Sequence, residues 1–439
     1  MLTQTKRILG WLLALLMIFS VPAMAETTEI KATYDLVSVR VNGNYINAPS
    51  YLYQNYVYVP LRAVLEAMGA EVLWNGETQS ISITTKKAEP KMEPRTFAIN
   101  EGEDRSFEAH TNYFKISIDG EEKMISHFLL DGTTYVPVSV FYDHFSCHVL
   151  QHQGTMSVRI YSPEYKTFGE NEVFYVNDTA YTTTEVQDIS AVMTGRPNPT
   201  TLNDYAYVED FLLNASVVQT LGEQTISADG FSEYYDASGY DKLIRSYGIK
   251  DVESFTENVI WPMYYSQNIT EETFGLYLNP TDEDLANFLP TSPYGQGRWL
   301  KAKHILIEKT EDGSGLKLAE ELLSKVKDNP LEFDSLMKTY SKDPGSAEQP
   351  EGYLFTEGQM VTEFYEATLP LQVGEISGIV ESSYGYHIIL KVADYENGVP
   401  MEEVKDELKR LYINNTYQNM LIELMAETDT VLNRAVIAE

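Results

Sequence analysis

Two of the seven histidines lie on short apolar stretches whose side chains alternate as in β-strands. His304 belongs to the stretch 301–307, and His387 belongs to the stretch 385–392. Each histidine shares a strand face with the aliphatic residue two positions later. If the strands are neighbours in one sheet, the two imidazoles meet in its interior and form a hydrogen-bonded pair. Otherwise they are separate core residues, and the surrounding motifs decide between these interpretations.

A second group of histidines could bind a metal. His144, His148 and His152 accompany the single cysteine, Cys147, and on one helix a spacing of four would align imidazoles beside the thiol. An internal repeat argues against this arrangement, because residues after 146 correspond to a turn and a strand in the first copy. We therefore expect scattered histidines, no metal site and no cofactor.

The segment between the two histidine-bearing strands resembles the parvulin family of peptidyl-prolyl isomerases. Seven motifs carry the resemblance, in the family's order: Lys-His-Ile-Leu-Ile (303–307), Phe-Asp-Ser-Leu (333–336), Tyr-Ser-Lys-Asp-Pro-Gly-Ser (340–346), Phe-Thr-Glu-Gly-Gln-Met-Val (355–361), Phe-Tyr-Glu-Ala (364–367), Val-Gly-Glu-Ile-Ser-Gly-Ile-Val (373–380) and Tyr-Gly-Tyr-His-Ile-Ile (384–389). The resemblance covers the whole of 301–392. It implies an FKBP-like α+β domain with an antiparallel sheet.

The resemblance also implies which residues form the catalytic site. His304 and His387 match the paired histidines beneath the active site. Asp343 matches the cysteine or aspartate beside the rotating peptide bond, and Ser382 matches a hydroxyl residue that joins the histidine network. The histidines are then a structural hydrogen-bond pair, not an acid and a base.

Three further positions match the pocket that receives the proline ring. Met360 and Phe364 correspond to its floor and wall, and Leu354 to a third apolar wall. The loop 349–355 departs from the family's usual Gly-Gly-Asp-Leu-Gly pattern. The segment 308–312 is mostly acidic where phosphate-directed parvulins are basic, so we expect no selectivity for phosphopeptides.

Such a site needs no covalent chemistry. The barrier to rotation of an X–Pro bond is about 18–20 kcal/mol and arises from amide resonance. A pocket that grips proline, desolvates the amide and binds the twisted state better than either planar state is sufficient.

The periodicity of the same stretch predicts the elements that position these residues. Apolar side chains recur at helical spacing in three segments and alternate in three others. We predict strands at 302–307, 377–381 and 386–392, and helices at about 316–327, 332–340 and 363–369.

Residues 34–162 contain an internal repeat at an offset of 77. Tyr58-Val59-Pro60 matches Tyr135-Val136-Pro137, and each copy predicts a strand, a glycine turn, a second strand, a short helix after the proline and a final strand. The segment 58–74 resembles the copper amine oxidase N-terminal-like domain of exported bacterial proteins. The second copy is degenerate: Ser139 replaces the arginine and Gln151 the tryptophan. The resemblance implies a stalk or adhesion module and no copper.

The next region, 163–296, has helical periodicity and resembles the chaperone region of exported foldases of the SurA and PrsA type. The resemblance rests on the segments 174–186 and 280–285. After residue 394 a long amphipathic helix is predicted, which in that family packs back onto the helical region. The alternative for 163–296 is a helical linker without affinity for clients.

The first 25 residues have the pattern of a secretory signal peptide. Lys6 and Arg7 precede an apolar run, and Ala23-Met24-Ala25 forms a small-residue cleavage site. An uncleaved anchor is the alternative, and no cysteine follows the run to carry a lipid. Without Lys6 and Arg7 the chain has 30 basic and 65 acidic residues, so we expect no binding to nucleic acid.

Together these features predict a multidomain α+β protein located outside the cytoplasm. We expect it to be a foldase that isomerises Xaa-Pro bonds of exported proteins and also acts as a chaperone. The alternative is a non-catalytic holdase or envelope-binding module. Residues 26–162 are expected to contact envelope components or to be a spacer. The predicted regions are a signal peptide (1–25), a repeated domain (26–162), a helical region (163–296), a parvulin domain (297–394) and a C-terminal helix (395–439).

Overall fold

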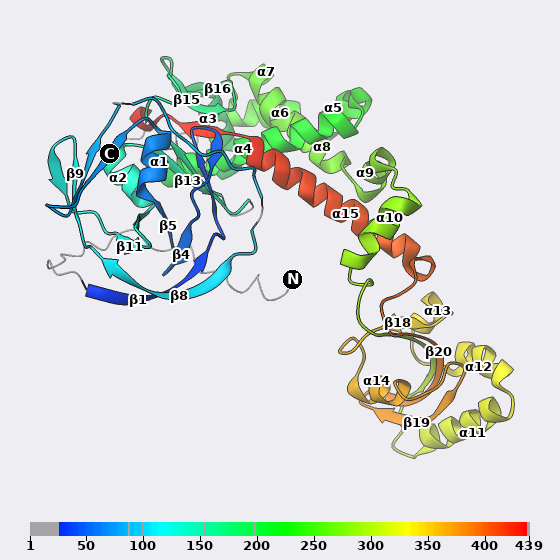
Figure 1. Cartoon of the computed structure of the whole chain (residues 1–439). Coiled ribbons are helices and arrows are strands. Elements are labelled where there is room, and N and C mark those ends of the chain that lie inside the picture. Colours follow the sequence, from blue (N-terminus) through cyan, green and yellow to red (C-terminus); the bar gives the residue numbers. More distant parts are fainter. Residues whose placement is uncertain are drawn as a thin grey trace. The chain divides into compact units, whose positions relative to one another are not determined.

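The computed structural model describes residues 26–436, except 87, 99, 153–154, 196–198 and 200. The predicted signal segment lies outside the described residues. The chain divides into two compact units. One contains the described residues up to Thr273 together with those from Gln418 on, and the other runs from Phe274 to Tyr417. This division falls inside the two predicted regions 163–296 and 395–439. Figure 1 labels the elements along the chain.

The first unit begins with a β-rich domain built around a closed barrel. The barrel order is β1-β4-β5-β12-β11-β8, with β1 and β8 paired along their whole length. Its interior is aromatic, with the rings of Tyr51 and Tyr135 5.0 Å apart. The strands are β1 (Glu26–Tyr34), β4 (Tyr51–Tyr53), β5 (Tyr56–Pro60), β8 (Glu103–Thr111), β11 (Phe128–Leu130) and β12 (Thr133–Pro137).

Two further sheets are made by exchange of strands between the repeats. The first strand of each copy pairs in parallel with the last strand of the other copy, so β2 pairs with β14 and β9 pairs with β7. The sheet orders are β10-β9-β7-β6 and β13-β14-β2-β3. Their strands are β2 (Ser38–Val41), β3 (Asn44–Ile46), β6 (Glu71–Asn75), β7 (Ser80–Thr84), β9 (Lys115–Ile118), β10 (Glu121–Lys123), β13 (His148–His152) and β14 (Ser157–Tyr161).

One short helix follows the proline of each repeat, as predicted. Helix α1 (Leu61–Ala67) has Pro60 as its N-cap residue, and α2 (Ser139–Phe145) begins two residues after Pro137. Proline suits these positions because the first amides of a helix have no intrahelical acceptor. His144 lies on α2 while His148 starts β13, so the histidines do not share one helix.

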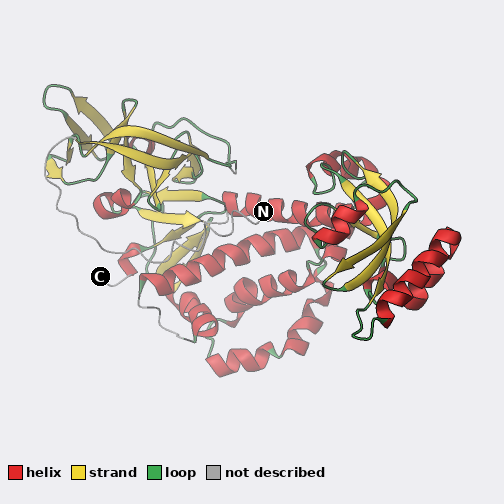
Figure 2. Cartoon of the chain, turned by 90° about the horizontal axis from the view of Figure 1, so that it is seen from below, coloured by secondary structure: helices red, strands yellow, loops and turns green. Residues whose placement is uncertain are grey.

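The rest of the first unit is mainly helical (Figure 2). Strands β15 (Glu172–Val176) and β16 (Thr179–Thr182) lead into it, and Thr182 and Glu185 form a reciprocal capping box at its first helix. The helices are α3 (Thr183–Thr194), α4 (Leu202–Thr225), η2 (Ala228–Gly230), α5 (Phe231–Ser238), α6 (Tyr240–Tyr247), α7 (Val252–Phe255), the π-helical η3 (Thr256–Ile260) and α8 (Trp261–Asn268). Among the described helices, none is both long and apolar enough to cross a bilayer.

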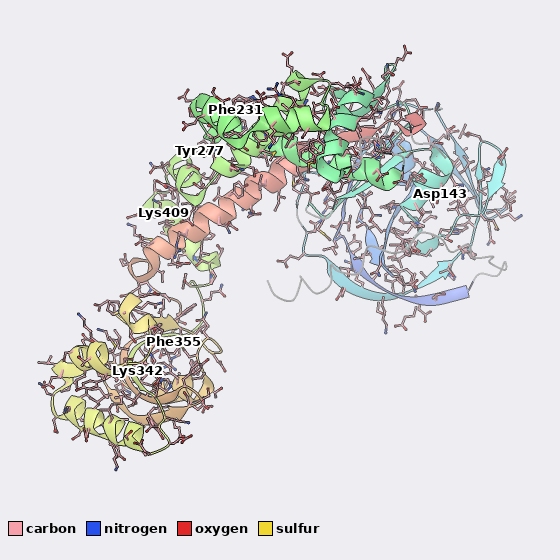
Figure 3. The ribbon with its side chains drawn as sticks, turned by 180° about the vertical axis from the view of Figure 1, so that it is seen from behind. Asp143, Phe231, Tyr277, Lys342, Phe355 and Lys409 are labelled. Carbon is pink, nitrogen blue, oxygen red and sulfur yellow. The ribbon has the colours of Figure 1, made fainter. Side chains whose placement is uncertain are left out.

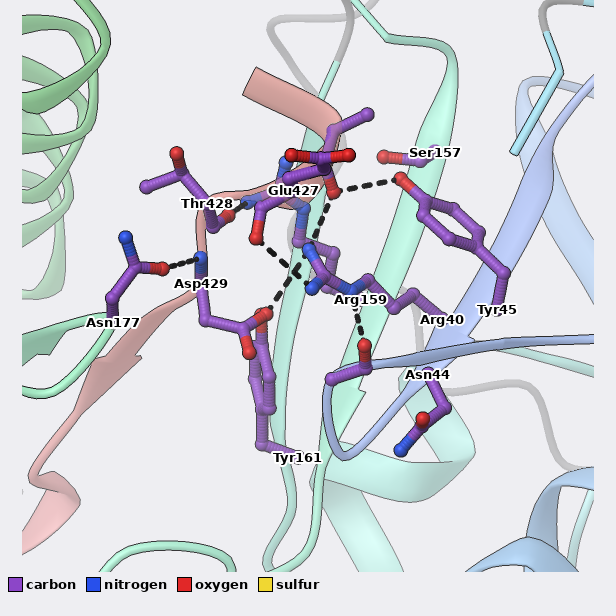
Figure 4. Close-up of polar contacts among 12 residues, drawn as sticks. Arg40, Asn44, Tyr45, Ser157, Arg159, Tyr161, Asn177, Glu427, Thr428 and Asp429 are labelled. Carbon is purple, nitrogen blue, oxygen red and sulfur yellow. Dashed lines mark hydrogen bonds and ion pairs between the residues drawn. The ribbon is translucent and has the colours of Figure 1, made fainter. Parts of the chain in front are cut away.

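The C-terminal segment completes this unit. Strand β21 (Thr430–Leu432) pairs antiparallel with β15. Just before it, helix α15 (Met401–Glu427) ends against two arginines: Arg40 Nη1 donates to the Ala426 carbonyl at 2.5 Å, and Arg159 Nη1 to the Thr428 carbonyl at 2.6 Å. Figure 4 shows both guanidinium groups beside this end of the chain. The arginines come from neighbouring register positions of β2 and β14.

The second unit is organised around a four-stranded antiparallel sheet of order β18-β17-β20-β19. Three helices precede the sheet: α9 (Glu271–Leu278), α10 (Asp282–Phe288) and the short η4 (Leu289–Thr291). The residues of α9 from Phe274 on belong to this unit. The sheet strands are β17 (Trp299–Ile307), β18 (Tyr353–Phe355), β19 (Ile376–Ser382) and β20 (Gly385–Tyr395). The helices around it are α11 (Ser314–Asp328), η5 (Pro330–Glu332), α12 (Phe333–Tyr340), α13 (Gly345–Glu348) and α14 (Thr362–Thr368).

The two faces of this sheet carry separate cores. Ile305 and Ile388 pack with α11 and α12 on one face. Ala302 and Ile389 pack with Phe364 of α14 on the other. The three helices and three strands predicted in this stretch are present, with ends shifted by up to three residues. Strands β17 and β20 are neighbours, which is the condition for the two histidines to meet. Strand β18 and helix α13 were not predicted. The predicted multidomain α+β class is confirmed.

Candidate active site

The central pair of strands brings the two predicted histidines together. In the β17–β20 register, His304 lies opposite Ile389 and Leu306 opposite His387, so both imidazoles point to the face that α14 covers. Their Nδ1 atoms are 3.0 Å apart and the rings are within 11° of parallel. Both side chains are buried. The alternation of the two strands therefore produces a direct imidazole–imidazole hydrogen bond.

The other two residues predicted for the catalytic set extend this pair at its two ends. His304 Nε2 lies 2.7 Å from Asp343 Oδ2, and His387 Nε2 lies 2.7 Å from Ser382 Oγ. Ser382 ends β19 beside the tight turn to β20, and Asp343 lies in the loop after α12. One continuous chain of hydrogen bonds thus runs from Ser382 through both histidines to Asp343.

A tyrosine that the sequence interpretation missed completes the network. The Tyr353 hydroxyl donates to Asp343 Oδ2 at 2.5 Å, and its ring lies edge-on to His304. Tyr353 is on β18, whose side chains alternate between the two faces of the sheet. Gly352 precedes it at φ +98°, where a Cβ would lie 2.8 Å from the Ala302 carbonyl oxygen. The glycine therefore allows β18 to approach β17.

The same alternation places Leu354 away from Met360 and Phe364. Leu354 packs with Trp299, Val399 and Val404, whereas Met360 and Phe364 belong to a different apolar cluster. The expectation that Leu354 forms a wall of the pocket is therefore corrected. The signal that could have found Tyr353 is the strand period in Tyr-Leu-Phe, in which only the first and third side chains can face α14.

The electrostatics of the network fix where the protons lie. Burial alone would raise the pKa of the Asp343 carboxyl, but hydrogen bonds from Tyr353 and His304 outweigh it and hold that pKa below its usual value. Burial, together with the charge at His304, lowers the pKa of His387 to about 4, even though Asp343 and Glu363 act in the opposite direction. Near neutral pH, Asp343 is therefore ionised and His387 is neutral.

The ionised carboxylate fixes one proton of this chain of hydrogen bonds. Asp343 only accepts, so Nε2 of His304 carries a proton. A neutral His387 carries one ring proton, so it donates through one nitrogen and accepts through the other, with His304 on one side and Ser382 on the other.

An apolar cluster lies beside this network. The Phe364 ring is 5.2 Å from the His304 ring and 5.6 Å from the His387 ring, nearly perpendicular to both. Phe364 is buried, and Met360 is partly buried in the same cluster. Figure 3 labels Phe355, another member of this cluster, in the unit that carries the site. The site therefore combines an apolar surface with a partly exposed carboxylate.

The site contains no arrangement suited to a metal. Across the described part of the chain, no group of three or more histidine, cysteine, aspartate or glutamate side chains is placed to hold an ion. The side chain of His152, the third histidine considered for a metal site, is not among those that the structure describes.

Two family models match the two stretches whose motifs carried a resemblance. Residues 295–396 match the model of the PPIC-type PPIASE domain, and residues 40–160 match the copper amine oxidase N-terminal domain. Both resemblances inferred from the motifs are thereby confirmed. Each model covers less than half of the chain.

Curated relatives match part of the chain. Foldase protein PrsA of Geobacillus sp. (strain WCH70) is 42% identical over 113 residues, which are 25% of this chain and 37% of that protein. Foldase protein PrsA of Halalkalibacterium halodurans is 32% identical over 194 residues, 43% of this chain and 54% of that protein. The chain thus spans between about a third and about half of the length of these relatives.

Solved structures of similar proteins include PrsA from Bacillus subtilis, which is 23% identical. It covers 59% of this chain and 91% of that chain, with a TM-score of 0.26. NmPin, the parvuline of Nitrosopumilus maritimus, is 36% identical and covers 23% of this chain and 100% of that chain, with a TM-score of 0.19.

Proposed function

We propose that this protein is an exported foldase whose second unit accelerates cis–trans isomerisation of Xaa-Pro bonds. One observation carries the proposal: the ionised Asp343 lies at the end of a buried histidine network, beside the apolar Met360 and Phe364. This arrangement occurs in the stretch that matches the PPIC-type PPIASE model. Similarity to PrsA foldases supports the same assignment.

The geometry lowers the rotation barrier by binding the twisted amide more tightly than the planar one. Met360 and Phe364 hold the proline ring, which removes water from one side of the Xaa-Pro bond. Loss of resonance leaves less negative charge on the carbonyl oxygen in the twisted state. A fixed carboxylate at Asp343 near that oxygen disfavours the planar form more than the twisted one. No covalent intermediate is formed.

The histidines serve this step as positioning residues. His304 and Tyr353 both donate to Oδ2 of the Asp343 carboxylate, so the charge is held at one place. His387, itself bonded to Ser382, in turn holds the ring of His304 from its other nitrogen. A neutral His387 keeps the proline pocket free of a buried positive charge.

The test is an isomerisation assay on the full chain. We expect a faster cis-to-trans rate for a short Xaa-Pro peptide, measured by NMR exchange spectroscopy, and Met360→Ala should reduce kcat/KM about tenfold, or ~1.4 kcal/mol. Leu331, which is 93% exposed, provides the control Leu331→Ala with unchanged rate. An unchanged rate in the Met360 variant would refute the pocket assignment.

The alternative function is a holdase without turnover, because the helical part of the first unit offers a separate surface for unfolded chains. No rate enhancement, together with suppression of aggregation of an unfolded client, would select this alternative. The predicted signal peptide favours exported proteins as the clients. Residues 26–162 are proposed to contact the cell envelope. Binding of the chain to isolated envelope fractions tests that part.

A further inference from the structure

The β-rich domain contains a cavity that the isomerase function does not use. Its volume is about 830 Å³, within the range of ligand sites. Helix α1, strands β6 and β7, the segment at 91–93 and the β11–β12 hairpin surround it. Residues that matter for its chemistry include Arg62, Glu66, Trp74, Gln79, Tyr113 and Phe114.

One wall of the cavity is aromatic. Trp74 leaves 46% of its surface exposed, and its ring is 4.5 Å from the edge-on ring of Phe114. Tyr113 adjoins Phe114 at 4.8 Å and its hydroxyl accepts from Gln79 Nε2 at 3.0 Å. The indole N–H of Trp74 donates to no acceptor among the described residues. An exposed indole with a free donor on a cavity wall is suited to a ligand with both apolar and polar faces.

The polar wall has balanced charge. Arg62 Nη1 donates to the Val72 carbonyl at 2.5 Å and to Glu66 Oε1 at 3.1 Å, and the described part of the chain provides no acceptor for its other N–H groups. Lys91 and Glu93 also line the cavity, so its two cations and two anions cancel, although the chain has a net charge of −33. A strongly charged ligand would gain nothing from such a wall.

Comparison of the two repeats shows whether the fold itself requires the arginine and the tryptophan of this cavity. At the offset of 77, Arg62 corresponds to Ser139 and Trp74 to Gln151. The second copy nevertheless forms the equivalent helix α2 and strand β13. The arginine and the tryptophan are therefore not required to build the repeat, and both line the cavity of the copy that has them.

We propose that this cavity binds a segment of a neutral oligosaccharide. The face of Trp74 would stack on the C–H groups of one sugar ring. Arg62 donates and Glu66 accepts, so together they match hydroxyl groups, each of which is both a donor and an acceptor. This site is independent of the isomerase activity, because it lies in the other unit of the chain.

The test is calorimetric titration of the full chain with two neutral probes, the tetramer of N-acetylglucosamine and cellotetraose. Both probes consist of neutral pyranose rings. Comparison of their affinities shows whether the site contacts the acetamido group. We expect Trp74→Gln and Arg62→Ser, which copy the second repeat, each to weaken binding at least about tenfold. The matched control is Gln151→Ala, at the equivalent exposed position, with unchanged affinity. Circular dichroism checks that each variant is folded.

Two outcomes would overturn the proposal. One is the absence of binding of either saccharide up to about 10 mM, which corresponds to less than roughly 3 kcal/mol of binding free energy. The other is Trp74-dependent binding of a proline-rich decapeptide without binding of saccharides, which would make the cavity a peptide groove. Isomerase activity of Trp74→Gln should equal that of the unmodified chain, so a loss of saccharide binding can be distinguished from a loss of isomerase activity.

Discussion

One oxygen of Asp343 receives both of the donors that define the site. Tyr353 and His304 reach Oδ2 at 2.5 and 2.7 Å, the Ser346 hydroxyl reaches the same oxygen at 3.2 Å, and Oδ1 accepts the Gly345 amide at 3.2 Å. Hydrogen bonds to an ionised group are about twice as strong as neutral ones. The charge is therefore held in one orientation at the surface of the pocket, and its protonation state depends on these two neighbours.

Removal of the tyrosine hydroxyl should change the pH dependence of the reaction. In Tyr353→Phe the carboxylate loses one donor, so the pKa of Asp343 rises and the acid limb of kcat/KM moves to higher pH. We expect kcat/KM at pH 7 to fall about three- to tenfold. Tyr384→Phe, at an exposed tyrosine, is the control. An acid limb that does not move would show that Tyr353 does not act on Asp343.

His387 should make the second unit sensitive to acid. Its pKa is about 4 in the folded state, below the unfolded value of roughly 6.5, so the unfolded chain binds more protons between these values. The stability is fully present above pH 6.5 and is lost as the pH falls toward 4, by about 2.5 kcal/mol at pH 4.5.

Hydrogen–deuterium exchange in peptides of β17 and β20 during urea unfolding measures this loss. We expect a smaller difference between pH 7 and pH 4.5 in His387→Gln, because glutamine does not titrate. His110→Gln, at an exposed histidine of the other unit, should behave like the unmodified chain. An identical pH difference in the His387 variant would contradict the assignment.

At the scale of elements, strand β18 divides two neighbouring residues between two roles. Tyr353 joins the network on one face, and Leu354 packs on Trp299 and Val404 on the other. Leu354→Ala should therefore lower the free energy of unfolding by about 1–2 kcal/mol, less than for a fully buried leucine. It should leave kcat/KM within about twofold of the unmodified value. Urea unfolding and the exchange assay, run beside Tyr353→Phe, distinguish the two roles.

The sequence predicted those parts of the site that rest on long, regular patterns. The strands carrying His304 and His387 alternate over several residues, so their shared face could be inferred before the structure was known. Strand β18 has only three residues and lies in the loop that departs from the family pattern, so it was not predicted as a strand, and Leu354 was assigned from the resemblance alone. The repeat of 77 residues was visible, but the exchange of strands between its copies was not, because parallel pairing of distant strands leaves no local signal.

At the scale of the molecule, the two arginines join the β-rich domain to the end of α15. Arg40 and Arg159 donate to the carbonyl groups of four consecutive residues, 425–428. Those carbonyls are the acceptors that a helix end leaves unpaired, at the negative end of its dipole. The β-rich domain and the C-terminal segment therefore stabilise each other.

Loss of one arginine should release this segment. Arg159→Leu leaves the carbonyls of Met425 and Thr428 without their donor, and we expect a loss of about 2–4 kcal/mol in the first unit. Thermal unfolding and limited proteolysis near residue 428 measure it. Arg245→Leu, at a side chain 79% exposed, is the control. Unchanged proteolysis in Arg159→Leu would show that Arg159 is not needed to hold the segment.

The pairing of β21 with β15 also sets an order for biosynthesis. Strand β15 is made before the whole of 274–417, and its partner strand is made after it. The chain is synthesised from its N-terminus, so the first unit has an open sheet edge at β15, and Arg40 and Arg159 lack their acceptors at 425–428, until residues 425–432 are made. The second unit, whose residues are contiguous, can fold during that interval. A chain that ends near residue 417 should therefore already isomerise prolines while its first unit is still incomplete.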